Sequence, residues 1–249
     1  MTTPRGLLPL LGQFHEISIS TADIRASVEF YEALGFSQCR TGDTWSHPYG
    51  VLTDGRVHLG LHEYRFASPS ITCVRPGIAA ATPEFAARGI ELEFAKTGED
   101  AFNEIGFRDP GGQMVTVLEA RTYFPSERRL QDRSLCGWFE ALSLPAADFA
   151  PVRDFWESMG FAALGEADSP WVREALVSGE LGLALHRPRT LDQPMLVFSA
   201  EDMRERLERI RALGIEPAPG LPRGLDPRAN ALLEAPEGTP LLLVEGELE

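Results

Sequence analysis

The sequence predicts an α+β protein in which two copies of one βαβββ-based fold stand in tandem. Three observations predict it. Residues 14–36 align without a gap on residues 139–161, and eight of the 23 aligned pairs are identical. In each copy, a first apolar segment is followed by a helical pattern that begins after an Asp and ends at a Gly. Later marks recur in the same order in both copies, and such a repeat indicates the architecture before any single residue is interpreted.

The later marks support a division of the chain into two domains. The polar and basic stretch 121–133 separates the copies and has little periodicity. We therefore expect an N-terminal domain over residues 1–122, a linker over 123–136 and a more degenerate C-terminal domain over 137–249. The recurring marks are Leu-x-Leu-His ending at His62 and His186, Gly-Ile-Glu beginning at Gly89 and Gly214, and the turns beginning at Pro110 and Pro236.

The first elements follow from local patterns. Glu16–Ser20 alternates polar and apolar residues, as a half-buried strand does. Asp23 is the predicted N-cap of a helix whose apolar residues share one face, and Gly35 is its predicted end. Strands are expected around Tyr49–Thr53 and Val57–His62, because Asp54-Gly55 between them is a strong hairpin signal.

A second unit follows in the N-terminal half, and the C-terminal half repeats the pattern. The stretch 217–227 is too rich in Pro and Gly to be regular and predicts a surface loop. The remaining expected elements are strands near Ser70–Val74, Glu91–Ala95, Glu104–Arg108 and Met114–Glu119, and helices near Ala79–Arg88, Phe149–Met159 and Glu201–Leu213.

Composition restricts the classes of partner. Asp and Glu exceed Lys and Arg by 37 to 23, which gives a formal net charge of −14. That charge repels phosphate backbones and anionic lipid, so we expect neither nucleic acid nor a membrane as partner. The three cysteines (Cys39, Cys73 and Cys136) lack metal-ligand spacing and indicate free thiols in the cytoplasm. A buried, inert Cys73 is preferred over a nucleophile, because no base lies near it in sequence.

A family resemblance rests on two motifs. The helix contains Phe30-Tyr31 and ends Leu-Gly-Phe at Phe36, and an Asp-Pro-x-Gly turn begins at Asp109 before a last strand. In these features the chain resembles the vicinal oxygen chelate (VOC) superfamily, which includes glyoxalase I, extradiol dioxygenases and bleomycin-resistance binding proteins. The resemblance covers both halves and implies open barrels around a cavity. In metalloenzyme members, His or Glu side chains on inward-facing strand positions bind a divalent metal ion there.

Most of these ligand positions lack a ligand in this chain. Counting from the motifs, the resemblance places the first-strand position on Glu16 and the last-strand position on Thr116. The matching positions of the second half fall on Ala141 and Leu242. Strand alternation turns Glu16 inward and His15 toward the helix. A divalent ion needs about three converging protein ligands, so we expect no metal and no cofactor.

The histidines offer a weak alternative set. His58 and His62 share a strand face but lie four residues apart, roughly 13 Å, which is too far to chelate one ion together. His62 and His186 occupy equivalent repeat positions, which favours a structural role at the barrel rim. His47 is interpreted as an exposed loop histidine.

The leading hypothesis is a protein that binds a small organic molecule in a barrel cavity without the usual metal site. Aromatic walls with a few polar groups suit such a ligand. No catalytic residue is assigned, and the chain is compatible with a monomer or a homodimer. The candidate ligand-binding residues are Glu16, Ser18, Trp45, Tyr49, Thr72 and Thr116.

Two alternatives stay open. The first is a divalent-metal-dependent lyase, isomerase or dioxygenase with shifted ligands, in which Glu16 combines with His58, His62 or Glu119. A slip of one residue in the strand register would bring in His15, because it exchanges the two faces of the strand. Such an enzyme would be a glyoxalase-like lyase or a dioxygenase-like oxidoreductase. The second alternative is a non-catalytic interaction module.

Overall fold

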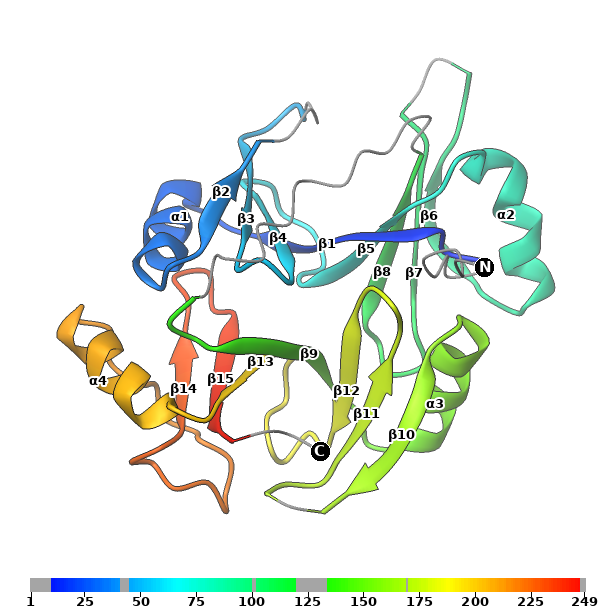
Figure 1. Ribbon diagram of the computed structural model, residues 1–249. Helices are drawn as coiled ribbons and strands as arrows, with labels where there is room; N and C mark the ends of the chain where they lie inside the picture. The colour runs from blue at the N-terminus through cyan, green and yellow to red at the C-terminus, as the bar shows by residue number, and fades with distance from the viewer. Residues whose placement is uncertain (1–9, 41–44, 100–101, 120–133, 169, 247–249) are drawn as a thin grey trace, which may run out of the picture.

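The computed structural model describes residues 10–40, 45–99, 102–119, 134–168 and 170–246. These residues form two mixed sheets and four helices, with the N-terminal half above the C-terminal half in Figure 1. The strand order is β2-β3-β4-β1-β5-β8-β7-β6 in the first sheet and β10-β11-β12-β9-β13-β15-β14 in the second. Both orders have two free ends, so each sheet is open. The predicted α+β fold of two tandem open barrels is confirmed.

The N-terminal sheet contains every strand expected from the sequence. It adds one short strand, β2, at its edge. The elements are β1 (Gln13–Ser20), α1 (Ile24–Ala33), β2 (Ser37–Cys39), β3 (Tyr49–Thr53), β4 (His58–His62), β5 (Ser70–Val74), α2 (Ile78–Ala87), β6 (Leu92–Lys96), β7 (Glu104–Arg108) and β8 (Met114–Leu118).

The C-terminal sheet repeats this arrangement, but its described residues include no counterpart of β6. Residues 217–227 form no helix or strand, as predicted. The elements are β9 (Trp138–Pro145), α3 (Phe149–Ser158), β10 (Ala162–Ala167), β11 (Arg173–Val177), β12 (Gly182–His186), β13 (Met195–Ala200), α4 (Met203–Ala212), β14 (Ala231–Glu234) and β15 (Pro240–Glu245).

The residues that the two copies share build the helix ends. The Asp23 side chain accepts a hydrogen bond from the Ala26 amide, and Asp148 accepts one from Ala150 in the equivalent helix. Gly35 follows the end of α1 with a φ of 90°, a left-handed conformation that glycine adopts without steric cost. The predicted cap and stop signals are confirmed.

The first helix of each half forms hydrogen bonds with the turn before the last strand of the other half. Trp156 Nε1 on α3 donates to Asp109 Oδ2 at 2.9 Å, and the Tyr31 hydroxyl on α1 donates to Glu237 Oε1 at 2.8 Å. Ser27 donates to the second oxygen of Glu237. Because Tyr31 and Trp156 are equivalent in the repeat, the two halves are joined by matching contacts around a pseudo-twofold axis.

The division at residues 122 and 137 stays a prediction, and most of the predicted linker lies outside the described residues.

The contact between Trp156 and Asp109 makes a testable contribution to stability. Burial raises the pKa of the Asp109 carboxyl, and the hydrogen bond from Trp156 opposes that shift. We expect Trp156→Phe to lower the free energy of unfolding by about 1–3 kcal/mol beyond the loss of ring volume, because it leaves a buried acceptor unsatisfied. Urea denaturation measures this. Trp171→Phe is the matched control, since Trp171 is also buried but its Nε1 donates no hydrogen bond to any described residue. Equal losses in both variants would contradict the assignment.

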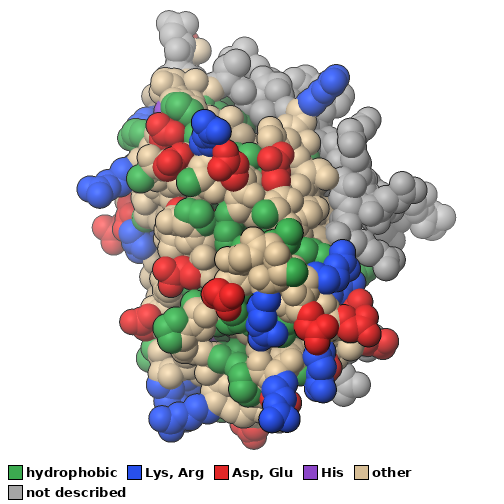
Figure 2. Space-filling model, turned by 90° about the vertical axis from the view of Figure 1, so that its left-hand side faces the viewer, with side chains coloured by type: hydrophobic (Ala, Val, Ile, Leu, Met, Phe, Trp, Pro, Cys, Tyr) green, Lys and Arg blue, Asp and Glu red, His purple; other side chains and the backbone are tan. Residues whose placement is uncertain are grey.

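The surface shows mixed charge. On the face drawn in Figure 2, acidic and basic side chains are interspersed with apolar ones. None of the helices in the described part of the chain is long and apolar enough to cross a membrane.

Candidate functional site

A buried carboxylate, Glu16 on β1, is the centre of the candidate site. The residue is 1% exposed. The Tyr49 hydroxyl on β3 donates to its Oε2 at 2.6 Å, and the Ser18 hydroxyl donates to its Oε1 at 2.7 Å. His62 Nε2 at the end of β4 lies 3.0 Å from Oε1. Three strands therefore supply polar partners to one carboxylate that is withdrawn from water.

The strand pairing explains this convergence. The β3–β4 hairpin pairs Tyr49 with His62. The parallel pairing of β1 with β4 then sets Ser18 against Gly60. The Glu16 side chain lies over Gly60, since a Cβ atom at Gly60 would stand only 2.0 Å from Glu16 Oε1. Glycine at position 60 thus leaves the space through which the carboxylate reaches His62.

A β-bulge corrects the expected orientation of His15. The register of β1 against β5 shifts between Phe14 and Glu16, so His15 is the extra residue of the bulge. Its Nε2 lies 3.7 Å from Glu16 Oε2. The expectation that His15 faces the helix together with Ile17 was wrong, because a bulge breaks the alternation of period two and re-aims a side chain.

His47 extends the polar chain beyond His62. Its Nε2 lies 3.0 Å from His62 Nδ1. A carboxylate only accepts hydrogen bonds, so a neutral His62 donates from Nε2 to Glu16 and accepts at Nδ1 from His47. The His47 ring is half-buried and stacks on Tyr64, with centroids 5.1 Å apart. The interpretation of His47 as an exposed loop histidine was wrong, because the loop folds back over the end of β4.

The electrostatics of the cluster favour an ionised Glu16. Burial by itself would raise the pKa of the Glu16 carboxyl, but the hydrogen bond from His62 and the nearby His15 and His62 rings outweigh it, so the pKa is lowered. Burial, followed by the neighbouring His62, lowers the pKa of the His47 ring. The site therefore combines a buried anion with imidazoles that can bind a proton or a cation.

Aromatic side chains border the cluster. The Trp45 ring meets His62 edge-on at 5.1 Å and lies 5.9 Å from Phe102, while Phe66 meets His62 from another direction at 5.5 Å. Tyr64 and Phe102 are each 58% exposed, although both are large and aromatic. An apolar border around a buried polar centre is typical of sites for small organic molecules.

The remaining sequence candidates lie at different distances from Glu16. Thr72 joins the cluster, because its hydroxyl lies 2.7 Å from the Ser18 hydroxyl. Thr116 stands beside Thr72 in the β5–β8 register and contacts the Ser70 hydroxyl at 2.9 Å. His58 is buried but lies at the opposite end of β4 from His62. The fold thus brings Glu16, Ser18, Trp45, Tyr49 and Thr72 together, with Thr116 one contact further away.

Buried thiols take no part in this arrangement. Cys73 is fully buried, and burial raises the pKa of its thiol. Burial also raises the pKa of Cys136 to about 12. Both thiols stay protonated at neutral pH, as the inert interpretation of Cys73 expects.

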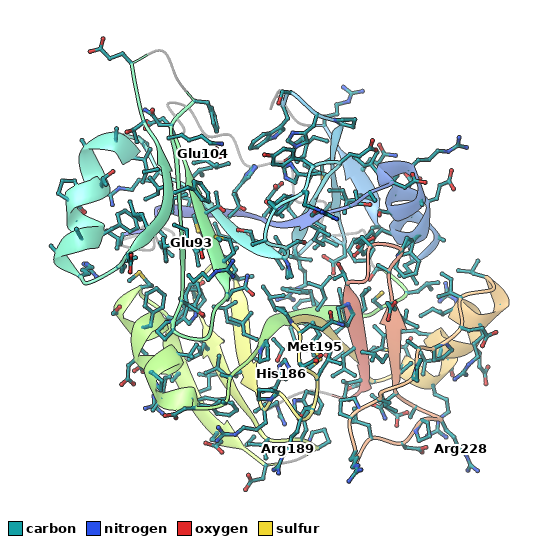
Figure 3. All side chains as sticks on the ribbon, turned by 180° about the vertical axis from the view of Figure 1, so that it is seen from behind. Glu93, Glu104, His186, Arg189, Met195 and Arg228 are labelled. Atoms are coloured by element: carbon teal, nitrogen blue, oxygen red, sulfur yellow. The ribbon has the colours of Figure 1, made fainter. Side chains whose placement is uncertain are left out.

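The equivalent position of the C-terminal half has a different chemistry. His186 Nδ1 contacts the Ser143 hydroxyl at 2.8 Å and Nε2 contacts the Leu191 carbonyl at 2.9 Å. Burial lowers the pKa of His186 to about 4. His186 and Met195 lie inside this half in Figure 3. An apolar cluster fills the same side of the sheet: Trp171, Met195, Val197, Leu232, Leu242 and Val244.

The donors around Glu16 are of the type that binds divalent metal ions. Two imidazoles and one carboxylate form the donor set of many iron and zinc sites. As the side chains stand, however, no group of three or more His, Cys, Asp or Glu within the described ranges is arranged to hold an ion.

Sequence comparison identifies no relative of this chain. No protein-family model matches the sequence, and no curated protein matches it either. Solved structures do match over the whole length. Homoprotocatechuate 2,3-dioxygenase from Arthrobacter globiformis is 17% identical, with a TM-score of 0.63 over 100% of this chain and 83% of that one.

Two further structures agree with the first. A variant of homoprotocatechuate 2,3-dioxygenase from B. fuscum in complex with HPCA is 16% identical, with a TM-score of 0.62 over 95% of this chain and 71% of that one. A catechol 2,3-dioxygenase is 11% identical, with a TM-score of 0.55 over 95% of both chains.

These structures correct one expectation. The expectation of no cofactor was wrong, because the solved structures named above, which match 95–100% of this chain, are extradiol dioxygenases, a metal-dependent class of the superfamily. The lack of a metal-binding side chain at Thr116, Ala141 and Leu242 therefore does not show that the chain binds no metal. The chain has the fold of the vicinal oxygen chelate superfamily, in the tandem two-domain form that it shares with extradiol dioxygenases.

Proposed function

We propose that the N-terminal half is a divalent-metal-dependent enzyme that acts on a small organic molecule, with Glu16, His62 and His15 as its metal ligands. One observation carries the proposal. Two imidazole nitrogens approach opposite oxygens of one buried carboxylate, His62 at 3.0 Å and His15 at 3.7 Å. This is the two-histidine, one-carboxylate donor set that suits non-haem iron and related ions.

The neighbouring residues support this role. Metal binding would require a deprotonated His62 Nε2, so the neutral His62 ring would carry its proton on Nδ1. The neutral His47 ring would then carry its own proton on Nδ1, and its Nε2 would accept the hydrogen bond from His62. The hydroxyls of Tyr49 and Ser18 hold the carboxylate in place. A bound divalent ion would supply a Lewis acid for oxygen atoms of the substrate.

The aromatic border supports an aromatic substrate. Trp45 and Tyr49 present rings next to His62, at centroid distances of 5.1 and 4.5 Å. Offset and edge-on contacts of this kind favour a planar ring. The structural neighbours named for homoprotocatechuate and catechol also act on aromatic molecules. The free cysteines support a cytoplasmic location.

Metal content tests the proposal. Protein purified without chelator and loaded with Fe²⁺, Mn²⁺ or Zn²⁺ is expected to retain about one ion per chain after desalting, measured by elemental analysis. His62→Gln is expected to lose the ion. His58→Gln is the matched control, because His58 is also buried on β4 but lies at its other end. Retention of no ion by the wild type, or equal retention by both variants, would contradict a metal site at Glu16.

His47 is expected to position His62. Removal of the group that contacts Nδ1 in His47→Ala should weaken metal affinity by about 10–100-fold, as loss of such partners does at other metal sites. Chelator competition measures the affinity, and ¹⁵N NMR of the His62 ring reports the tautomer without any need for activity. His47→Gln retains an amide that can accept the hydrogen bond and should restore part of the affinity. An unchanged His62 tautomer in His47→Ala would rule out this role.

A further inference from the structure

Two large aromatic side chains, Tyr64 and Phe102, lie exposed next to the candidate site. Among the described residues, three aromatic side chains are more than half exposed, and the third is Trp138. The Trp138 ring is covered by the Arg56 guanidinium, which lies 3.0 Å from its centroid. Tyr64 and Phe102 instead contact rings at the candidate site. Apolar groups that are exposed together beside a site are typical of a ligand-binding surface.

Trp45 connects Phe102 to the buried centre. The Trp45 ring meets the His62 ring edge-on at 5.1 Å, and His62 contacts Glu16. Phe102 meets the Trp45 ring at 5.9 Å, so it lies two ring contacts out from His62. One ring of a ligand can cover the surface beside His62, whereas a second ring is needed to cover Phe102 as well.

Tyr64 lies on the same surface, although it follows β4 and Phe102 precedes β7. The Tyr64 ring stacks on His47 at 5.1 Å, and His47 lies 5.5 Å from the Trp45 ring. Phe102 and Trp45 stand at 67° to each other, and an edge-on contact leaves both faces of one ring uncovered by the other. Trp45, Tyr64 and Phe102, here called the aromatic rim, thus form a surface on which a planar ring can stack.

Charges beside the aromatic rim balance each other. Lys96 on β6 interacts with Tyr64 and forms an ion pair with Glu104 on β7, at 2.5 Å. Glu104 is labelled in Figure 3. Because the ammonium group already has a carboxylate partner, this pair adds no net charge, and the aromatic rim favours an uncharged group.

We propose that the small molecule bound at the Glu16 centre has two linked or fused planar rings, the outer of which is uncharged and packs against Tyr64 and Phe102. This inference rests on the proposed function, because the inner ring would lie at the metal centre beside His62. It makes Tyr64 and Phe102 the residues that determine the size of the substrate. Burial of an exposed ring face is favourable both for its apolar area and for the contact between rings.

Phenylphenols are suitable probes, with phenol as the one-ring reference. The ortho, meta and para isomers are all used, because the direction of the outer ring depends on the link. Isothermal titration calorimetry on the full chain is expected to show that the best isomer binds about tenfold more tightly than phenol. Equal affinity of phenol and all three isomers would overturn the proposal.

Two further compounds test the chemistry of the outer ring. Cyclohexylphenol with the same link is the matched control, since its outer ring is equally apolar but not planar, and it should bind severalfold more weakly than the phenylphenol. Equal affinity of these two compounds would overturn recognition of a planar ring. Tighter binding of a phenylphenol that carries a carboxylate on its outer ring would contradict an uncharged outer ring.

Variants locate the outer ring. Phe102→Leu and Tyr64→Leu each replace an exposed ring by an apolar side chain that cannot stack, and each should remove most of the preference for phenylphenol over phenol. Leu213→Ala is the matched control and should leave the preference unchanged, because Leu213 is 52% exposed at the end of α4, in the other half of the chain. An unchanged preference in both ring variants would also overturn the proposal.

Metal content separates this inference from the proposed function. Both affinities are measured in one preparation whose ion content is known from elemental analysis, so their ratio reports on the aromatic rim by itself. Wild type that retains an ion but binds phenol and phenylphenol equally would contradict only the two-ring ligand. Wild type that retains no ion but still prefers phenylphenol would contradict the metal centre and support the role of the aromatic rim.

Discussion

Replacement of Glu16 by glutamine is expected to abolish metal retention and to lower the free energy of unfolding by about 2–4 kcal/mol. The Glu16 carboxylate is 1% exposed and accepts from Tyr49, Ser18 and His62. An amide nitrogen would face at least one of these donors and could not accept from it. Elemental analysis and urea denaturation measure the two effects.

The effect of Glu16→Gln on stability should depend on pH. Because the folded-state pKa of Glu16 is lowered, its ionised form contributes stability above the ordinary pKa of 4.5, and this contribution is lost as the pH falls through the folded-state value. The difference between wild type and variant should therefore be largest near neutral pH and should shrink in acid.

Glu174→Gln is the matched control for Glu16→Gln. Glu174 is 3% exposed, and its Oε2 accepts no hydrogen bond from any described residue. Loss of its charge should therefore cost much less stability than loss of the Glu16 charge. A Glu16→Gln variant that keeps both its metal ion and its stability would show that the carboxylate is neither a ligand nor a structural centre.

Gly60→Ala is expected to disrupt the same site without removing any polar group. A Cβ at position 60 would stand 2.0–2.3 Å from three atoms of the Glu16 carboxyl group. The carboxylate would have to move and would lose His62 and its other partners, at a cost of about 2–4 kcal/mol. We expect loss of metal retention and a lower urea midpoint. Gly50→Ala on β3 is the matched control, because Ile24, at 3.9 Å, is the only described residue that its Cβ would meet.

A double variant separates steric conflict from a general strand defect. In a Glu16→Ala background the atoms that meet the new Cβ are absent, so Gly60→Ala should then cost little. Such non-additivity is expected for residues in direct contact. A full loss of stability from Gly60→Ala in both backgrounds would contradict the explanation.

The sequence predicts the helix ends and the turns well. Asp23 and Gly35 act within a few residues of themselves, so their local chemistry indicates the start and end of α1. The Asp54-Gly55 signal predicts the β3–β4 hairpin but not its register, because a two-residue turn would pair Thr53 with Arg56. The structure pairs Thr53 with His58 across a longer loop, and only this register sets Tyr49 against His62. The inward direction of Glu16 and Ser18 followed from the apolar Ile17 between them.

Long-range pairing could not be predicted in the same way. The parallel contact of β1 with β4, which places Glu16 over Gly60, joins strands about 40 residues apart, and no local pattern specifies its register. The bulge that turns His15 toward Glu16 depends on how β1 meets β5. His47 reaches His62 only because its loop folds back over the strand end.

The sequence by itself therefore determined that this protein has a repeated α+β fold. It also indicated one inward carboxylate, Glu16, whose equivalent in the second copy is Ala141. Local interactions are sufficient for this, because caps, turns and strand alternation depend on neighbouring residues. Only the tertiary structure decided which groups meet this carboxylate, namely the hydroxyls of Ser18 and Tyr49 and the ring of His62. Hydrogen-bond geometry depends on strand register, and the register depends on the packing of the whole sheet.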